Sequence, residues 1–211
     1  MAIKYSELVI EHFKNPHNVG TLEKPDASAT EGSPACGDQL TVYLKVNPET
    51  QVIEDIKFQS YGCASNIATA SIITDLALGK TLKEAKEISW KQAAEELGGL
   101  PPVKMHCSVL AVDALRSAIK DWEHKHLGKE LDDNLTKKNL VKELQKVIYG
   151  KVGVDIVSLR LLKYVGIDDN KNVLIELAIQ KDDPFIDDLK HEINERMEKF
   201  PDIASVKISL V

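Results

Sequence analysis

The sequence predicts an α+β fold: a small antiparallel sheet packed by helices, followed by a small C-terminal α-β-β-α-β domain. Alternating apolar and polar residues over 40–46 indicate a strand, and apolar stripes at helical spacing come after it. A polar stretch over 128–139 separates these patterns from a second set of strands and helices. The chain has 211 residues, of which 43% are apolar, and this is enough for two cores. We therefore expect domains at 1–127 and 140–211, joined by a linker at 128–139.

The first elements follow from local patterns near the N-terminus. Val9, Ile10 and Phe13 form an apolar stripe that predicts a short helix. The polar segment over 18–34 contains glycine and proline, and we expect it to be a loop.

A β-hairpin is predicted next. The strand over 40–46 is followed by the turn residues 47–50 and by a returning strand marked by Ile56 and Phe58. An antiparallel pair brings its first and last residues to the same end. The residues just before and just after this hairpin should therefore be neighbours.

Helices are expected to fill the rest of the N-terminal domain. Apolar spacing predicts them over 67–78, 82–88 and 91–97. Gly98-Gly99 and Pro101-Pro102 then stop regular structure, and a longer amphipathic helix begins near Cys107.

The C-terminal domain has its own order of elements. We expect a helix over 140–149, strands over 156–165 and 173–179, a helix over 186–200 and a last strand over 204–211. Asp168-Asp169-Asn170 provides the turn between the first two strands. The domain contains no cysteine.

Composition excludes several classes of function. A net charge of −6 argues against binding to nucleic acid, whose phosphates attract the opposite charge. No apolar run approaches the roughly 18 residues that a membrane span needs. Residues 1–7 lack the pattern of a signal peptide. We expect a cytoplasmic protein, in which thiols stay reduced and can bind metal.

The three cysteines form a candidate metal site. Each lies in a junction next to glycine, proline or a helix start: Cys36 in Ala35-Cys36-Gly37-Asp38, Cys63 after Gly62, and Cys107 after His106. An odd count does not fit a disulfide framework. Single free cysteines are usually buried apolar residues, but this grouping with Asp38 and His106 favours ligation of a soft metal. The other histidines tested this way, His12, His17, His124 and His126, are poor candidates.

The motifs resemble a known family over residues 1–127. The stretches that match are Pro34-Ala35-Cys36-Gly37-Asp38, Tyr61-Gly62-Cys63 and Leu100-Pro101-Pro102-Val103-Lys104 with His106-Cys107. They are similar to those of the IscU-type scaffolds for iron–sulfur cluster assembly, the family of the NifU N-terminal domain. The resemblance implies an assembly site made of Cys36, Asp38, Cys63, His106 and Cys107. It also implies that Leu100, Pro101, Pro102, Val103 and Lys104 form the segment read by an Hsp70-type chaperone in members that use one.

This family resemblance implies a scaffold and not an enzyme. The chain would build a [2Fe–2S] cluster from iron and from the persulfide sulfur of a cysteine desulfurase, then pass it to recipient apo-proteins. Such a cluster needs four ligands, here three thiolates with Asp38 or His106. We expect Cys107 to accept the persulfide, and three thiolates per chain leave room for a cluster shared in a homodimer. Zinc suits the same ligands, so the alternative is a zinc-bound, SufU-like sulfurtransferase.

The C-terminal domain resembles the small SufT- or MIP18-type domain linked to iron–sulfur protein maturation. The match is clearest at Gly153-Val154-Asp155-Ile156-Val157. That family often has Cys-Pro where this chain has Asp183-Pro184, which argues against thiol chemistry in this domain. We expect it to serve in docking or dimerisation.

Overall fold

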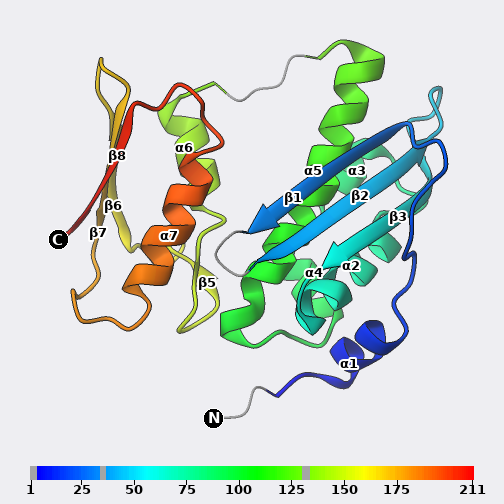
Figure 1. Cartoon of the computed structure of the whole chain (residues 1–211), viewed down its shortest axis with the longest axis horizontal. Helices are drawn as coiled ribbons and strands as arrows, with labels where there is room; N and C mark the ends of the chain where they lie inside the picture. The colour runs from blue at the N-terminus through cyan, green and yellow to red at the C-terminus, as the bar shows by residue number, and fades with distance from the viewer. Residues whose placement is uncertain (1–3, 34–36, 130–133) are drawn as a thin grey trace. The chain divides into compact units, whose positions relative to one another are not determined.

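The computed structural model describes residues 4–33, 37–129 and 134–211, and the chain divides into two compact units, 1–131 and 132–211. Each unit combines strands and helices around its own core, which confirms the α+β class (Figure 1).

The N-terminal unit contains a three-stranded antiparallel sheet in the order β1-β2-β3. The strands are β1 (Ala27–Ser33), β2 (Asp38–Val46) and β3 (Ile53–Tyr61). The predicted hairpin is confirmed as β2 and β3. The prediction of a loop over 18–34 is wrong for 27–33, because these residues form β1. Their small and polar side chains show no clear apolar alternation, and their strand is instead fixed by backbone pairing along β2.

Among the described residues of this unit, six helical segments accompany the sheet. They are α1 (Glu7–Lys14), α2 (Ala64–Ala77), α3 (Leu82–Glu87), α4 (Trp90–Glu96), a 3₁₀ turn η1 (Pro102–Lys104) and α5 (Met105–Leu127). Helix α5 packs against β1 and β2, while α2 packs against β3 (Figure 1). The core consists of alternate residues of the strands together with the buried faces of these helices. This packing fixes the ends of β2, α2 and α5 relative to one another.

Helix α1 buries a different face from the predicted one. Val9 and His12 are its buried residues, whereas Ile10 and Phe13 are each more than 40% exposed. The predicted stripe is therefore wrong for Ile10 and Phe13. A polar contact accounts for the difference, because Nδ1 of His12 lies 2.8 Å from Oγ of Ser71 on α2. A histidine that has a hydrogen-bond partner can be buried on the inner face of a helix, although the apolar pattern predicts that other residues lie there.

In the C-terminal unit, the described part (134–211) contains a three-stranded sheet in the order β6-β7-β8 and two helices. Its elements are α6 (Lys137–Leu144), β4 (Ile148–Tyr149), β5 (Val154–Asp155), β6 (Leu162–Ile167), β7 (Asn172–Leu177), α7 (Ile186–Met197) and β8 (Ser205–Leu210). Strands β6 and β7 are antiparallel, and β8 joins β7 in parallel. The predicted helix-strand-strand-helix-strand order is present, with the short β4-β5 pair added to it.

Two boundaries in this unit differ from the prediction. Helix α6 begins at Lys137, inside the expected linker, because the Thr136 side chain caps it, and it ends at Leu144 and not near 149. The strand expected over 156–165 is wrong for 156–161. Those residues form turns, in which Oδ1 of Asp155 accepts a hydrogen bond from the Ser158 amide at 2.7 Å. Hydrogen bonds within the turn therefore determine the local structure there, although the apolar residues predicted a strand.

None of the helices among the described residues has both the length and the apolar character that crossing a bilayer demands.

Candidate metal centre

Three elements bring the predicted ligands together. Asp38 is the first residue of β2, Cys63 is the residue that precedes α2, and Cys107 lies in the first turn of α5. Pairing of Gln39 with Tyr61 places the start of β2 beside the end of β3, as the hairpin argument predicts. Side chains that are far apart in the chain therefore meet at one end of the sheet.

The distances within this group match those of a tetrahedral metal site. The Sγ atoms of Cys63 and Cys107 are 3.7 Å apart, and Oδ2 of Asp38 lies 3.6 Å from the first and 3.9 Å from the second. A tetrahedral ion bound at zinc–sulfur distances has sulfur ligands about 3.8 Å apart and a sulfur–oxygen separation of about 3.5 Å. The three donors thus fit one ion with little rearrangement.

Asp38 is held in place by backbone geometry. Its carboxylate is buried, and Oδ1 accepts a hydrogen bond from the Cys63 amide at 3.2 Å. Gly62 permits this approach, because a Cβ at that position would lie 2.9 Å from Cγ and Oδ1 of Asp38 and 2.5 Å from Nδ2 of Asn66. The absence of a side chain at Gly62 therefore leaves room for the oxygen ligand, a role that the sequence analysis did not assign to this glycine.

His106 offers a fourth donor. A ring nitrogen of His106, Asp38 and Cys107 can supply ligand atoms that all lie within 4.8 Å of one another. Nε2 of His106 is buried and has no hydrogen-bond partner among the described residues. Burial, followed by the charge of Lys104, lowers the pKa of His106 and favours the neutral imidazole. A neutral, unpartnered imidazole nitrogen is the form that binds metals.

The pKa values of the two thiols are shifted in opposite directions. The hydrogen bond with Cys107 is the largest influence on Cys63 and lowers its pKa to about 6, against the effect of burial. The same hydrogen bond, together with burial, raises the pKa of Cys107. The charge of Lys104 favours a thiolate at Cys107, but the hydrogen bond to Cys63 and, after it, burial outweigh this effect. The hydrogen bond between the two thiols therefore favours the thiolate at Cys63 over the thiolate at Cys107.

Lys104 supplies positive charge beside this thiolate. Burial disfavours its charged form, but Cys63, Cys107 and Asp38 together raise its pKa. The site therefore combines a cation with anionic ligands in a half-buried setting.

The predicted residues that remain are Cys36 and the segment 100–104. Cys36 is outside the described residues, so its part in the site stays a prediction. The segment 100–104 leads directly into α5: Leu100 packs on a small cluster with Val9 and Leu97, while Pro102 and Val103 are exposed.

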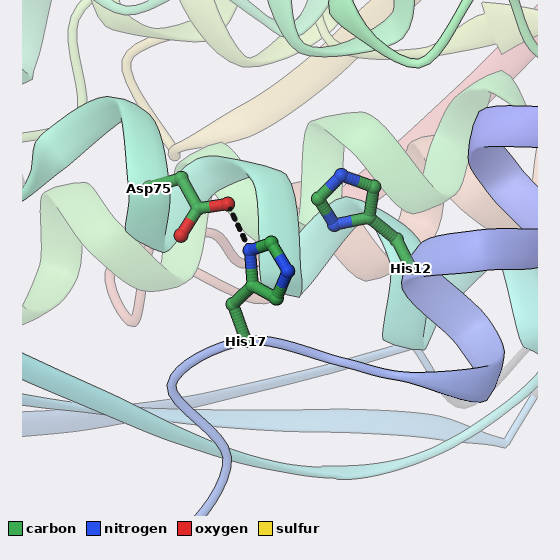
Figure 2. A group of neighbouring side chains, drawn as sticks. All are labelled: His12, His17 and Asp75. Atoms are coloured by element: carbon green, nitrogen blue, oxygen red, sulfur yellow. Dashed lines mark hydrogen bonds and ion pairs between the residues drawn. The ribbon is translucent and has the colours of Figure 1, made fainter.

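The sequence analysis missed a second group of side chains that could hold a metal ion. His12, His17 and Asp75 can supply ligand atoms within 4.8 Å of one another (Figure 2). Burial, followed by the charge of His17, lowers the pKa of His12. The sequence analysis rated both histidines as poor candidates for ligands. It did not consider Asp75, which lies 58 positions after His17. No local spacing links these residues, so only the packing of α1 on α2 reveals the group.

Comparison with known proteins adds an independent finding. The model of the NifU-like N terminal domain matches residues 4–129. Two proteins of Archaeoglobus fulgidus, named iron-sulfur cluster assembly scaffold proteins IscU 1 and IscU 2, are each 51% identical over 148 residues. These matches cover 70% of this chain and 94% of each relative. The scaffold protein IscU of Azotobacter vinelandii is 51% identical over 124 residues, which cover 57% of this chain and 95% of that protein.

The match therefore covers the whole unit that carries Asp38, Cys63, His106 and Cys107, and it extends over nearly all of these relatives. On this basis the protein belongs to the family of the NifU-like N-terminal domain.

Proposed function

We propose that this protein is a scaffold on which a [2Fe–2S] cluster is assembled and from which it passes to apo-proteins. The observation that carries the proposal is the preformed group of Cys63, Cys107 and Asp38, spaced as ligands of one tetrahedral ion. A ring nitrogen of His106 lies within 4.8 Å of the ligand atoms of Asp38 and Cys107. Cys36 completes the three thiolates. The cluster is the cargo of this site, so the protein acts as a carrier and needs no catalytic turnover.

A mixed ligand set suits a cluster that has to leave. Four thiolates hold a [2Fe–2S] cluster firmly, whereas a carboxylate or an imidazole is a harder and more exchangeable ligand. We therefore assign Asp38 the role of the labile ligand. Asp38→Ala should retain the cluster longer than the wild type does, as measured by the rate of transfer to an apo-ferredoxin. Faster loss from this variant would contradict the assignment.

Anaerobic reconstitution tests the proposal directly. The metal-free protein is incubated with ferrous iron, cysteine and a cysteine desulfurase, and visible absorption is followed. We expect the bands of a [2Fe–2S] cluster and their loss in Cys63→Ser. Zinc competes for the same donors. If no cluster forms, and the protein instead stimulates the desulfurase while retaining zinc, it is a sulfurtransferase and the proposal fails.

The entry of sulfur is assigned to Cys107, on the resemblance to IscU-type scaffolds. The hydrogen bond between the two thiols favours the thiolate at Cys63, which makes that residue a second candidate. In either case a thiolate attacks the terminal sulfur of the desulfurase persulfide, and the desulfurase cysteine leaves as a thiolate. Mass spectrometry after incubation with desulfurase and cysteine, without iron, locates the added sulfur. An adduct only at Cys63 or Cys36 would refute the assignment to Cys107.

The partners of the proposed scaffold follow from its function. A cysteine desulfurase supplies sulfur, and apo-proteins receive the cluster in the cytoplasm, where thiols stay reduced. The exposed Pro102 and Val103 suit recognition of the segment 100–104 by an Hsp70-type chaperone. Substitution of Val103 by Glu should abolish chaperone binding and leave cluster assembly intact.

We assign the C-terminal unit to the SufT- or MIP18-type domains and give it a role in docking or dimerisation. Where those domains often carry a cysteine, Asp183 accepts a hydrogen bond from the Tyr149 hydroxyl at 2.6 Å, an arrangement that builds structure and offers no thiol. A homodimer would bring two sets of thiolates together. Light scattering of the full chain, with and without a cluster, measures its oligomeric state.

A further inference from the structure

We propose that His12, His17 and Asp75 form a second metal site, which binds a divalent transition metal ion such as Zn²⁺ independently of the thiolate centre. Figure 2 shows the His17 ring between the Asp75 carboxylate and the His12 ring. A ring nitrogen from each histidine and a carboxylate oxygen lie within 4.8 Å of one another. Two imidazoles and one carboxylate are a ligand set that suits zinc and its neighbours in the first transition row.

The ligands come from two elements that pack together. His12 belongs to α1, His17 follows the end of that helix, and Asp75 lies on α2. The ring centroids of the two histidines are 4.9 Å apart, and Nδ1 of His17 lies 2.6 Å from Oδ2 of Asp75. His12 is 9% exposed, whereas His17 and Asp75 are accessible to solvent. The group therefore has a buried inner ligand and an open outer side through which an ion can enter.

Hydrogen bonds to the surrounding residues hold this group in position. Oγ of Ser71 lies 2.8 Å from Nδ1 of His12 and accepts a hydrogen bond from the His17 amide at 2.9 Å. Nδ2 of Asn18 donates to Oδ1 of Asp75 at 3.0 Å. Ligating imidazoles and carboxylates normally have such outer partners, which orient them and contribute to metal affinity. Ser71 and Asn18 thus orient His12 and Asp75 before an ion binds.

The chain around His17 is also anchored to the sheet. The backbone carbonyl of Asn18 accepts a hydrogen bond from the Phe58 amide at 3.0 Å, and the Gly20 amide donates to the Phe58 carbonyl at 2.8 Å. Because the backbone at His17 is already fixed, the residue loses less conformational entropy when an ion binds. His17 is therefore exposed but its backbone is anchored.

Binding requires one small rearrangement. The 2.6 Å between His17 and Asp75 is a hydrogen-bond distance and is shorter than the roughly 3.3 Å between ligands of a tetrahedral zinc ion. An ion that replaces the shared proton moves these two groups apart and binds both, while His12 supplies the second imidazole.

The site is separate from the thiolate centre. Cys63 precedes α2, while Ser71 and Asp75 lie 8 and 12 residues further along the chain. At the rise of a helix this places them about 12 Å and 18 Å from the helix start. One ion cannot contact both groups, and each can be titrated by itself.

Calorimetric titration of the metal-free full chain with Zn²⁺ tests the proposal. We expect two ions per chain, a tight one at the thiolate centre and a weaker one at the second site. His17→Ala and Asp75→Asn should each weaken the second ion at least tenfold and leave the first unchanged. The matched control is His124→Ala, which removes an exposed histidine from α5 and should change neither. Binding of one ion only, or a second ion unaffected by both substitutions, would overturn the proposal.

Imidazole NMR provides a readout that needs no variant. Addition of the second equivalent of Zn²⁺ to the wild type should shift the ring signals of His12 and His17. The ring signals of His106 should respond to the first equivalent only. If the second equivalent leaves both His12 and His17 unchanged, the second ion binds elsewhere and the proposal is wrong.

Discussion

Gly62 is the residue on which the position of the Asp38 carboxylate depends. A methyl group at Gly62 would lie 2.9 Å from the carboxylate and 2.5 Å from the Asn66 amide, and both separations are too short. Gly62→Ala should therefore displace Asp38 and weaken Zn²⁺ binding at the thiolate centre by ten- to a hundredfold, the range seen when a supporting residue is lost. Competition with a chromophoric chelator measures this affinity.

Gly32→Ala is the control for Gly62→Ala. A methyl group at Gly32 would have the Asp38 carbonyl as its nearest contact, at an ordinary 3.8 Å. This variant should bind Zn²⁺ as the wild type does. Equal affinities for all three proteins would show that the Asp38 carboxylate tolerates displacement.

The thiol pair gives a prediction for the pH dependence of alkylation. Because the hydrogen bond from Cys107 stabilises the thiolate of Cys63, the metal-free protein should show half-maximal alkylation of Cys63 near pH 6 and not near 9, the ordinary value. Iodoacetamide labelling followed by mass spectrometry gives the rate at each residue. Cys107 should react more slowly throughout, because it is buried and its pKa is raised.

Cys107→Ala separates the hydrogen bond from the other influences on Cys63. Loss of the donor should raise the pKa of Cys63, so the labelling midpoint moves to higher pH. If the midpoint stays near pH 6 in this variant, the charge of Lys104 and the helix start stabilise the Cys63 thiolate, and the hydrogen bond does not.

At the scale of elements, Ser6 attaches α1 to the rest of the N-terminal unit. Its hydroxyl accepts a hydrogen bond from the Val9 amide at 3.1 Å and donates one to the Leu97 carbonyl. Ser6→Ala should lower the free energy of unfolding by about 1–2 kcal/mol, from the lost cap and the lost contact. Urea unfolding measures the change. Ser6→Thr keeps the hydroxyl, so its free energy of unfolding should fall much less. If both variants lose the same free energy, the hydrogen bonds of the Ser6 hydroxyl do not explain the loss.

Elements with regular apolar spacing were predictable, whereas those built from turns or small residues were not. The β2-β3 hairpin and α5 follow from apolar periodicity, and both are present. Strand β1 contains serine, threonine and glutamate, so only its pairing with β2 identifies it. In the C-terminal unit, the apolar run after Asp155 resembled a strand, but hydrogen bonds of the Asp155 side chain turn the chain there.

The same distinction applies to the candidate site. Asp38 and Cys63 could be placed together from the sequence, because an antiparallel hairpin joins its two ends. The approach of Cys107 to them depends on how α5 packs against the sheet, which no local pattern encodes. The family resemblance supplied that link. The group of His12 with Asp75 had neither a hairpin nor a motif to reveal it.

At the scale of the whole molecule, separate cores predict separate unfolding transitions. The core around Leu40 and Ile119 belongs to the first unit, and the core around Leu140 and Ile193 belongs to the second. Zn²⁺ at a hundred times its dissociation constant should stabilise the first unit by about 2.7 kcal/mol, or roughly 8 °C in its midpoint. Scanning calorimetry with and without Zn²⁺ measures both transitions.

The transition of the second unit is the internal control. Its midpoint should not move with Zn²⁺, because the ligand residues discussed above all belong to the first unit. A single transition that shifts as a whole would show that the two units unfold together.

The spread of the ligands along the chain has a consequence for protein synthesis. Asp38 and Cys107 are 69 positions apart, and the helix that carries the second of them is the last element of its unit to leave the ribosome. A nascent chain that ends before α5 lacks Cys107, so its thiolate centre is incomplete. Translation of this unit must finish before a cluster can be loaded, and cluster formation on stalled chains of increasing length should appear only after α5 has emerged.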